Sequence, residues 1–200
     1  SQSKRMRIAN AIKSDGNDSA FLSKLDSIMW LLNIRGNDVP CNPVLLCSGI
    51  LHSDSSFDLY IDLNKIPIGF DDHVGKDIRV HDLDSFIDIQ NGNNNKIMFD
   101  TNSSNLWSYN VFKSAGYEIV KAQDVCSLPK ACKNETEIQG MKDCHIRDAV
   151  AECTFLAWFD DQVNQGNMLD EGTLADKLDS LRAKQDMYKG LSFGTISAAA

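Results

Sequence analysis

The feature that most constrains this chain is a long helical pattern between Lys133 and Val163, which reads KNETEIQGMKDCHIRDAVAECTFLAWFDDQV. Asn134 is a suitable N-cap, and Glu137 stands at the third helical position, as in a capping box. Gly166 supplies a C-terminal stop. The three-to-four spacing predicts one helical face made of Ile138, Met141, His145, Ala149, Glu152, Leu156, Phe159 and Val163. We therefore expect a single long helix over this stretch.

Beyond Ala149 this helix is apolar around most of its circumference. The residues concerned are Val150, Ala151, Cys153, Phe155, Leu156, Ala157, Trp158 and Phe159. A helix of this kind belongs inside a larger domain, and the residues after it are too few to cover it. Leaving such side chains in water is unfavourable by roughly 1.5–3 kcal/mol each. We expect the chain by itself to self-associate, or to hold this helix against its N-terminal part.

Composition and charge exclude several classes of protein. Hydrophobic residues make up 42% of the chain and charged residues 24%, which is typical of a folded globular protein. The formal net charge of -8, without a basic patch, argues against nucleic acid or an anionic membrane as partner. The sequence contains no apolar span of roughly eighteen residues and no apolar signal core at SQSKRMRIAN. A cytoplasmic protein is the expectation.

Helical and strand patterns alternate through residues 1–125. A helix over 4–13 should turn Met6, Ile8, Ala9 and Ile12 inward and its basic residues outward. Asp26 is a candidate cap for the next helix, and the hairpin-length link between strands 44–51 and 57–63 predicts antiparallel pairing. Alternation within 57–63 predicts a sheet with one wetter face. Further strands are expected over 20–22, 78–80, 96–100 and 117–121, and further helices over 82–90 and 104–114, with a loop over 91–95. This order predicts a layered α/β domain with a mixed sheet.

Two more elements are expected after the long helix. Asp170 can cap a helix over 171–185, in which Leu174, Leu178 and Leu181 form a narrow apolar stripe. The stretch 190–197, GLSFGTIS, has the pattern of a first strand in a sheet that this chain does not complete. The chain therefore combines one whole domain with part of another.

Residues that could carry chemistry are few. The spacings Cys41-x5-Cys47 and Cys126-x5-Cys132 match no common zinc pattern, so reduced thiols are expected. His145 has carboxylates nearby but no ligand set, and we expect it to pair with a local carboxylate. The sequence contains no glycine-rich phosphate loop and no G-x-S-x-G elbow.

Arg35 is the one candidate binding residue. It stands beside Gly36 in a proline-bounded loop, NIRGNDVP, directly after an apolar helix. Loops of this kind often rim a cleft, where an arginine can clamp a carboxylate or carbonyl of a peptide. The alternative is that Arg35 pairs with Asp38 and holds the turn.

Three stretches together resemble a known family. LDSIMWLLNIRGNDVPCNPV, with the buried strand after it, resembles the second N-terminal domain of multidomain Xaa-Pro aminopeptidases. LPKACKNETEIQGMKDCHIRDAVAECTFLAWFDD resembles the junction and first long helix of their catalytic domain, and GLSFGTIS the strand that opens the catalytic sheet. The likeness runs in one order from about Lys4 to Ser197. Prolidases and creatinases, which share the catalytic fold, fit these stretches less well.

The resemblance implies a homodimeric parent enzyme with the pita-bread fold, which removes an N-terminal residue when proline follows it. Such enzymes use two divalent metal ions, commonly manganese, with a bridging water that attacks the scissile carbonyl. Their ligands are two aspartates, one histidine and two glutamates, all in segments beyond the GLSF-x-TIS strand. This chain reaches Ala200 before any of them. We therefore expect no bound metal and no catalytic residue here, and carry over only Arg35, as a substrate-binding residue.

The resemblance also sets the expected domain organisation. Residues 1–125 form a creatinase N-terminal-like α/β domain, 126–133 a linker, and 134–200 the truncated start of a pita-bread (α+β) catalytic domain. A chain ending near Val125 should behave better in solution. The alternative is a non-catalytic α/β interaction module or truncated relative: the missing ligand set favours it, whereas the retained catalytic-domain helix favours the enzyme.

Overall fold

The computed structural model describes residues 1–89 and 92–198. It divides into two compact units. The sheet unit comprises Ser1–Val39 with Pro43–Cys132, and the helix unit comprises Lys133–Ala200 with Pro40–Asn42. The end of the helix predicted over 82–90 and the start of the loop predicted over 91–95 lie outside the described residues.

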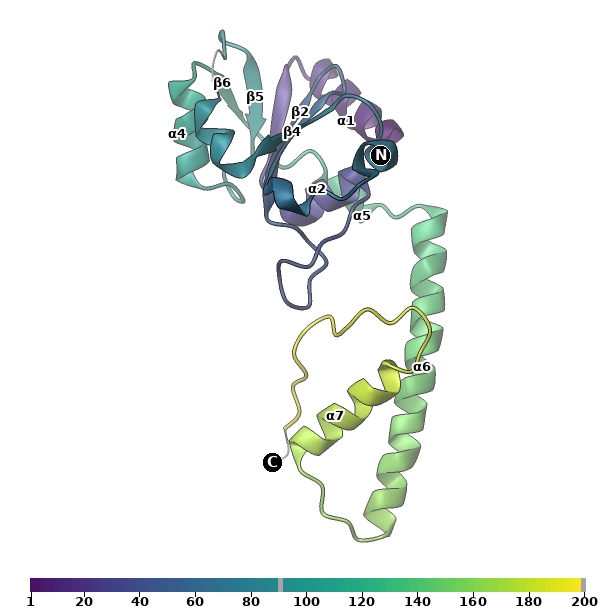
Figure 1. Ribbon diagram of the computed structural model, residues 1–200. Helices are drawn as coiled ribbons and strands as arrows, with labels where there is room; N and C mark the ends of the chain where they lie inside the picture. The colour runs from purple at the N-terminus through teal and green to yellow at the C-terminus, as the bar shows by residue number, and fades with distance from the viewer. Residues whose placement is uncertain (90–91, 199–200) are drawn as a thin grey trace. The chain divides into compact units, whose positions relative to one another are not determined.

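Within the described residues, six strands form one mixed sheet (Figure 1). Neighbouring strands follow the order β4-β3-β2-β1-β5-β6. β2 pairs antiparallel with β1 and β3, whereas the β3–β4, β1–β5 and β5–β6 pairs are parallel. The mixed sheet and the antiparallel β2–β3 hairpin are confirmed. The strands are β1 Ser19–Leu22, β2 Cys47–His52, β3 Phe57–Ile61, β4 Ile78–Asp82, β5 Lys96–Phe99 and β6 Glu118–Lys121.

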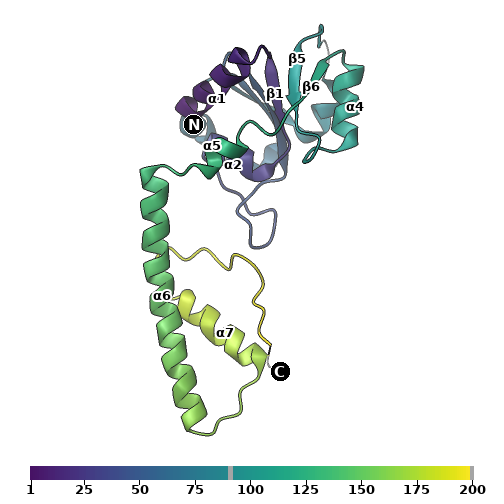
Figure 2. The ribbon, with the colours of Figure 1, turned by 180° about the vertical axis from the view of Figure 1, so that it is seen from behind.

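Helices cover both faces of this sheet (Figures 1 and 2). α1 (Gln2–Ser14) and α2 (Leu25–Leu32) contribute to one apolar core, together with the short helix α3 (Phe70–Val74). η2 (Leu83–Asp88) and α4 (Leu106–Ser114) contribute to a second, largely aromatic core. A further 3-10 turn is η1, Leu63–Lys65. All of β3 is buried, so the prediction of a wetter sheet face is wrong. Side chains of η2 and α4 pack with Tyr60 on the face that the alternating pattern predicted to be exposed to water.

A close cross-strand contact explains Gly49 on β2. A Cβ at this position would lie 2.2 Å from Cζ of Phe57, whose ring covers the glycine. Phe57 is fully buried, so its ring has little room to move aside. The strand therefore carries glycine where the neighbouring ring needs the space.

The helix α1 is predicted correctly, but two of its side chains are not. Ile8, Ala9 and Ile12 are buried as expected, whereas Met6 is exposed. Arg5 is fully buried, although basic residues were predicted to face outward. Its guanidinium donates to the carbonyls of Ser55 (2.7 Å) and Lys76 (2.6 Å). Helical periodicity cannot reveal such partners, because they come from distant loops.

The segment after β6 contains a short helix, α5 (Ser127–Ala131). Cys126 precedes it and is fully buried in the core of the sheet unit. Lys130 on α5 forms an ion pair with Asp26. Asp26 is not the cap of α2, because that helix begins at Leu25 and Asp26 lies in its first turn. The segment predicted as a linker thus groups with the sheet unit through Cys132.

The helix unit consists of α6 (Glu135–Asn164) and α7 (Glu171–Arg182), which lie side by side (Figures 1 and 2). The predicted capping box is confirmed: Asn134 and Glu137 exchange two hydrogen bonds of 2.9 Å between side chain and backbone. Asp170 caps α7 by accepting from the Thr173 amide at 2.6 Å. Gly166 follows the end of α6 in the left-handed region, at φ 76°.

Little of the helix unit is buried. Among its described residues, the buried apolar side chains are Ala151 and Leu181. Ile138, Met141, Leu156 and Val163 of the predicted face of α6 are exposed, as expected of a helix that the residues after it are too few to cover. The described stretch 190–198 contains no strand, because a strand needs a hydrogen-bonding partner and none lies beside it. None of the helices over the described residues is both long and apolar enough to cross a bilayer.

Candidate functional site

The loop that carries Arg35 begins at a well-defined helix end. α2 stops at Leu32, and Asn33 adopts the left-handed conformation at φ 59°. The carbonyl of Asn33 is hydrogen-bonded to the His73 ring at 2.7 Å. Gly36 follows, and a Cβ there would lie 2.1 Å from Cγ of Leu45. The glycine beside Arg35 is therefore required by the close approach of Leu45.

The base of the loop is fixed by hydrogen bonds across it. The amides of Gly36 and Asp38 donate to the carbonyls of Pro43 (3.2 Å) and Val44 (3.0 Å). Oδ2 of Asp38 accepts from Nζ of Lys65 and from the Leu46 amide, both at 2.7 Å. These bonds, that from Lys65 first, hold the pKa of Asp38 below its usual range.

Arg35 is exposed and does not hold this turn. Its Nη1 donates to the adjacent carbonyl of Ile34 at 2.8 Å. Among the residues the structure describes, the ion-pair partner of Asp38 is Lys65. The alternative in which Arg35 pairs with Asp38 is therefore wrong. A role for Arg35 in substrate binding stays a prediction, on a loop whose geometry is set by other residues.

A second cluster of charged side chains escaped the sequence analysis. Asp58, on β3, is buried and accepts hydrogen bonds from three residues on β2 and β4. His52 Nε2 donates at 2.6 Å and His81 Nε2 at 2.8 Å. Arg79 donates through Nε at 2.6 Å and through Nη2 at 2.9 Å. The register that pairs Asp58 with Arg79 across parallel strands brings the cluster together. The sequence did contain a signal for this cluster: a carboxylate in the middle of one predicted strand (Asp58) and an Arg-x-His pattern in another (Arg79 and His81).

This cluster is built to hold a carboxylate rather than to transfer a proton. Burial by itself raises the pKa of Asp58, but the hydrogen bonds from His52, Arg79 and His81 outweigh it and hold that pKa well below its usual range. His81 also stacks on Tyr60, at 4.9 Å between ring centroids. Burial, together with the charge of Asp58, raises the pKa of Tyr60 to about 12. A carboxylate whose pKa is held well below its usual range is a weak base and accepts a proton poorly.

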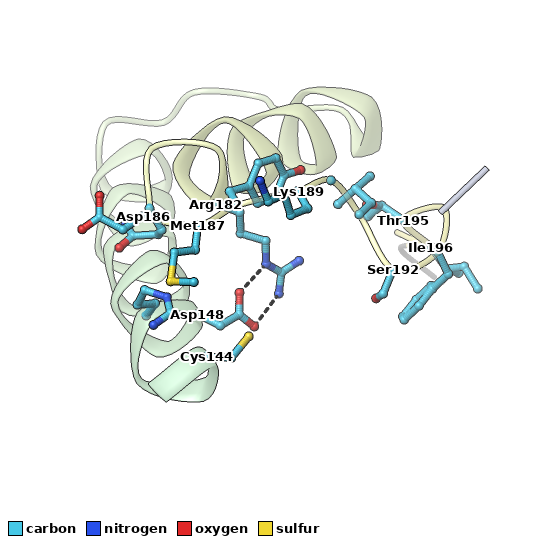
Figure 3. Close-up of a pocket in the computed structure, with 15 residues that line it drawn as sticks. Cys144, Asp148, Arg182, Asp186, Met187, Lys189, Ser192, Thr195 and Ile196 are labelled. Atoms are coloured by element: carbon cyan, nitrogen blue, oxygen red, sulfur yellow. Dashed lines mark hydrogen bonds and ion pairs between the residues drawn. The ribbon is translucent and has the colours of Figure 1, made fainter. Parts of the chain in front are cut away.

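In the helix unit, α6, α7 and the stretch after α7 line an open pocket of about 610 Å³ (Figure 3). Arg182 reaches across it to Asp148 with bonds of 2.7 and 3.2 Å, and to Glu152 at 2.9 Å. Cys144 lies beside Asp148 in the same wall (Figure 3). The arginine is thus neutralised by two carboxylates and ties α7 to α6.

His145 does not have the partner expected of it. Its Nδ1 is hydrogen-bonded to the carbonyl of Met141 at 2.8 Å, one turn earlier on α6. The neighbouring carboxylates are engaged elsewhere, Asp148 with Arg182 and Asp143 with Gln139 at 2.8 Å. The predicted histidine–carboxylate pair is therefore wrong.

The cysteines and carboxylates do not converge on a metal centre. All six cysteines are free thiols, as predicted, and Cys47 and Cys126 are buried. Burial raises the pKa of Cys47 to about 12 and raises that of Cys126 as well, so both remain protonated. Over residues 1–89 and 92–198, no group of three or more His, Cys, Asp and Glu side chains could hold a metal ion. The described residues thus do not fit a dinuclear centre.

Comparison with known proteins places the sheet unit. Residues 1–137 match the family described as Creatinase/Prolidase N-terminal domain. The chain belongs to this family. The candidate loop and the Asp58 cluster both lie within the matched residues.

The sequence resembles fungal enzymes along nearly its whole length. It is 34% identical over 189 residues to a probable Xaa-Pro aminopeptidase P of Pyrenophora teres f. teres, covering 88% of this chain and 29% of that protein. A probable Xaa-Pro aminopeptidase P of Talaromyces stipitatus is also 34% identical, over 98% of this chain and 31% of its own. The chain therefore spans about a third of the length of the curated relatives that it matches.

A solved structure extends the likeness to the helix unit. The X-prolyl aminopeptidase of Caenorhabditis elegans, described as a cytosolic enzyme with a di-nuclear active site, matches with a TM-score of 0.88 at 28% identity. The match covers 98% of this chain and 33% of that chain. The resemblance inferred from NIRGNDVP and HIRDAVAECTFLAW is thereby confirmed.

Proposed function

We propose that this chain is part of a Xaa-Pro aminopeptidase that removes an N-terminal residue preceding proline at a dinuclear metal site. The observation that carries the proposal is the match to the C. elegans enzyme, which includes α6 and α7 as well as the creatinase/prolidase N-terminal domain. The proposed substrates are peptides with proline at the second position. The parent enzyme is proposed to be a cytoplasmic homodimer.

We place the metal ligands in the part of the parent that lies outside this chain. The described residues do not converge on a metal ion, and the relatives are about three times as long. The metal supplies the activated water when bound, and we propose manganese. The 200-residue chain alone is then inactive, and its residues serve to place the first helices of the catalytic domain.

The test is hydrolysis of a short Xaa-Pro peptide with added Mn²⁺ by two proteins: this chain, and the polypeptide encoded by the whole reading frame. We expect hydrolysis and stoichiometric metal for the whole polypeptide and neither for this chain. Metal-dependent cleavage by this chain would place the ligands within it and overturn the assignment. No cleavage by the whole polypeptide would favour the non-catalytic interaction module.

The role of Arg35 is tested in the whole polypeptide. A charged hydrogen bond to the peptide is worth roughly 1.5–3 kcal/mol, so Arg35→Ala should raise KM about tenfold or more while kcat changes little. Arg7→Ala, which removes an exposed arginine on α1, is the matched control. An unchanged KM in Arg35→Ala would remove this residue from the substrate groove.

The exposed apolar face of α6 supports a further property of the chain alone. Phe155, Leu156 and Phe159 line a groove of about 310 Å³ together with Leu174 and Leu178 of α7. Because this face has no sheet to cover it within the described residues, we propose that the 200-residue chain self-associates. Light scattering that shows a monomer, without binding of a hydrophobic dye, would contradict this.

A further inference from the structure

Two adjoining grooves cross the surface of the sheet unit above its aromatic core. One, of about 560 Å³, lies between the end of β1, the start of β2, η2 and the first turn of α4. The other, of about 580 Å³, lies between the η2 region and the outer side of α4. Ile87 and Trp107 line both, so the two form one continuous surface. We call it the Trp107 groove.

The Trp107 groove is nearly free of charge, and large apolar side chains line it together with uncharged polar ones such as Ser48, Asn105 and Asn110. Large exposed hydrophobic side chains line it: Leu46, Leu83, Ile87 (60% exposed) and Trp107 (52% exposed). Asp84 is the single charged residue among the described residues that line it. Depletion of charge and enrichment in aromatic and large apolar residues characterise the centre of a protein interface. A contiguous patch of this kind is rarely left open to water.

Trp107 is held in place before any partner arrives. Its ring lies 5.4 Å from that of Phe86, which is buried and packs in turn against Phe112 (5.6 Å) and Tyr60 (5.0 Å). A tryptophan that is fixed on one side and exposed on the other loses little conformational freedom on binding. Such residues contribute most of the energy at many interfaces.

We propose that the Trp107 groove receives an apolar segment from another domain of the same, longer polypeptide; this rests on the proposed function. The relatives that this chain matches are about three times its length. In a polypeptide of that length, a segment of another domain is covalently linked to the groove and is therefore present at high effective concentration. A second copy of the chain is the competing occupant, and a dilution series distinguishes it from a covalently linked segment, whose effective concentration does not change on dilution.

Oxidative footprinting of tryptophan tests this in solution. Trp107 should be oxidised several-fold more slowly in the polypeptide encoded by the whole reading frame than in the 200-residue chain, at every point of a dilution series. Trp30, which lies against the core of the sheet unit, should react equally in both and serves as the internal control. Equal oxidation of Trp107 in both proteins overturns the proposal. Protection that disappears on dilution also overturns it, in favour of a second copy.

A pair of matched variants supplies a second measurement. Ile87→Ser should lower the thermal midpoint of the whole polypeptide and increase its cleavage by protease, while leaving the sheet unit of the 200-residue chain folded. Ile68→Ser removes an equally large exposed side chain elsewhere on the sheet unit and should do neither. Equal effects of both variants on the whole polypeptide would overturn the proposal.

The outcomes separate this inference from the proposed function. Hydrolysis of the Xaa-Pro peptide by a polypeptide with an unprotected Trp107 refutes the docking surface alone. A protected Trp107 in a polypeptide that does not hydrolyse the peptide supports the docking surface and refutes the function alone.

Discussion

The sheet unit and the helix unit are both regular, but they bury very different amounts of apolar surface. In the sheet unit, Leu22, Leu31, Phe57 and Phe112 are fully buried within two cores. In the described part of the helix unit, burial is limited to Ala151 and Leu181, although α6 carries more large apolar residues than it can cover. The difference shows that a helix can form without its apolar side chains being buried. The backbone groups of α6 are hydrogen-bonded within the helix, whereas its apolar side chains need a further layer of protein to cover them.

The largest contrast is expected from deleting one apolar side chain in each unit. Phe57→Ala should lower the free energy of unfolding by about 3–5 kcal/mol, because the lost ring leaves a cavity over Gly49. In a sample dilute enough to be monomeric, Leu156→Ala, on the exposed face of α6, should change it by less than about 0.5 kcal/mol. Urea unfolding followed by circular dichroism measures both. A large loss in Leu156→Ala would show that α6 is covered in solution.

The next effect concerns the buried carboxylate of the sheet unit. Asp58→Asn removes the charge that His52, Arg79 and His81 surround, and should lower stability at neutral pH by roughly 1.5–3 kcal/mol. The folded-state pKa of Asp58 is depressed. Its contribution is therefore present above its unfolded pKa of about 3.9 and is lost as pH falls below that value.

The pH dependence supplies the check on this prediction. Stability measured from pH 7 downward should fall less steeply below about pH 4 in Asp58→Asn than in the natural chain. Asp88→Asn, at an exposed position of η2, is the control for the loss of one carboxylate, and Asp58→Asn should have the shallower acid limb of the two variants. Parallel acid limbs for Asp58→Asn and the natural chain would show that the residues around Asp58 do not lower its pKa in the folded protein.

A smaller effect is expected at the boundary between the units. A chain of residues 1–132 should unfold with the stability of the sheet unit, whereas one of residues 1–125 should lose about 1–2 kcal/mol, because Cys126 is buried and Lys130 pairs with Asp26. Urea midpoints of the two truncated chains test this. Equal midpoints would support a domain that ends at Val125, as the sequence predicted.

The smallest effect distinguishes one helix cap in each unit. Asn105 caps α4 by accepting from the Ser108 amide at 2.8 Å, and Asn134 caps α6 through its capping box. Alanine at either position should cost about 1 kcal/mol. Asn105→Ala should lower the unfolding midpoint of the sheet unit, whereas Asn134→Ala should fray the start of α6 without moving that midpoint. Amide hydrogen exchange at residues 135–140 measures the fraying.

Local patterns predicted the helices and strands well because their causes are local. The capping box at Asn134, the cap at Asp170 and the antiparallel β2–β3 hairpin all follow from residues a few positions apart. The candidate site was less accessible. The loop pattern around Gly36 and Pro40 identified Arg35 as a candidate. It did not reveal that Asp38 pairs with Lys65 instead, because Lys65 comes after β3 in the sequence.

What the sequence by itself determined is the order of the elements, their start and stop signals, and the membership of the family that NIRGNDVP and HIRDAVAECTFLAW indicated. Tertiary structure alone decided which side chains are buried and which charges meet. Arg5 can be buried because two loop carbonyls accept hydrogen bonds from its guanidinium, and Asp58 is surrounded because parallel pairing brings Arg79 beside it. These contacts join residues far apart along the chain, so no periodicity encodes them, and packing must settle them.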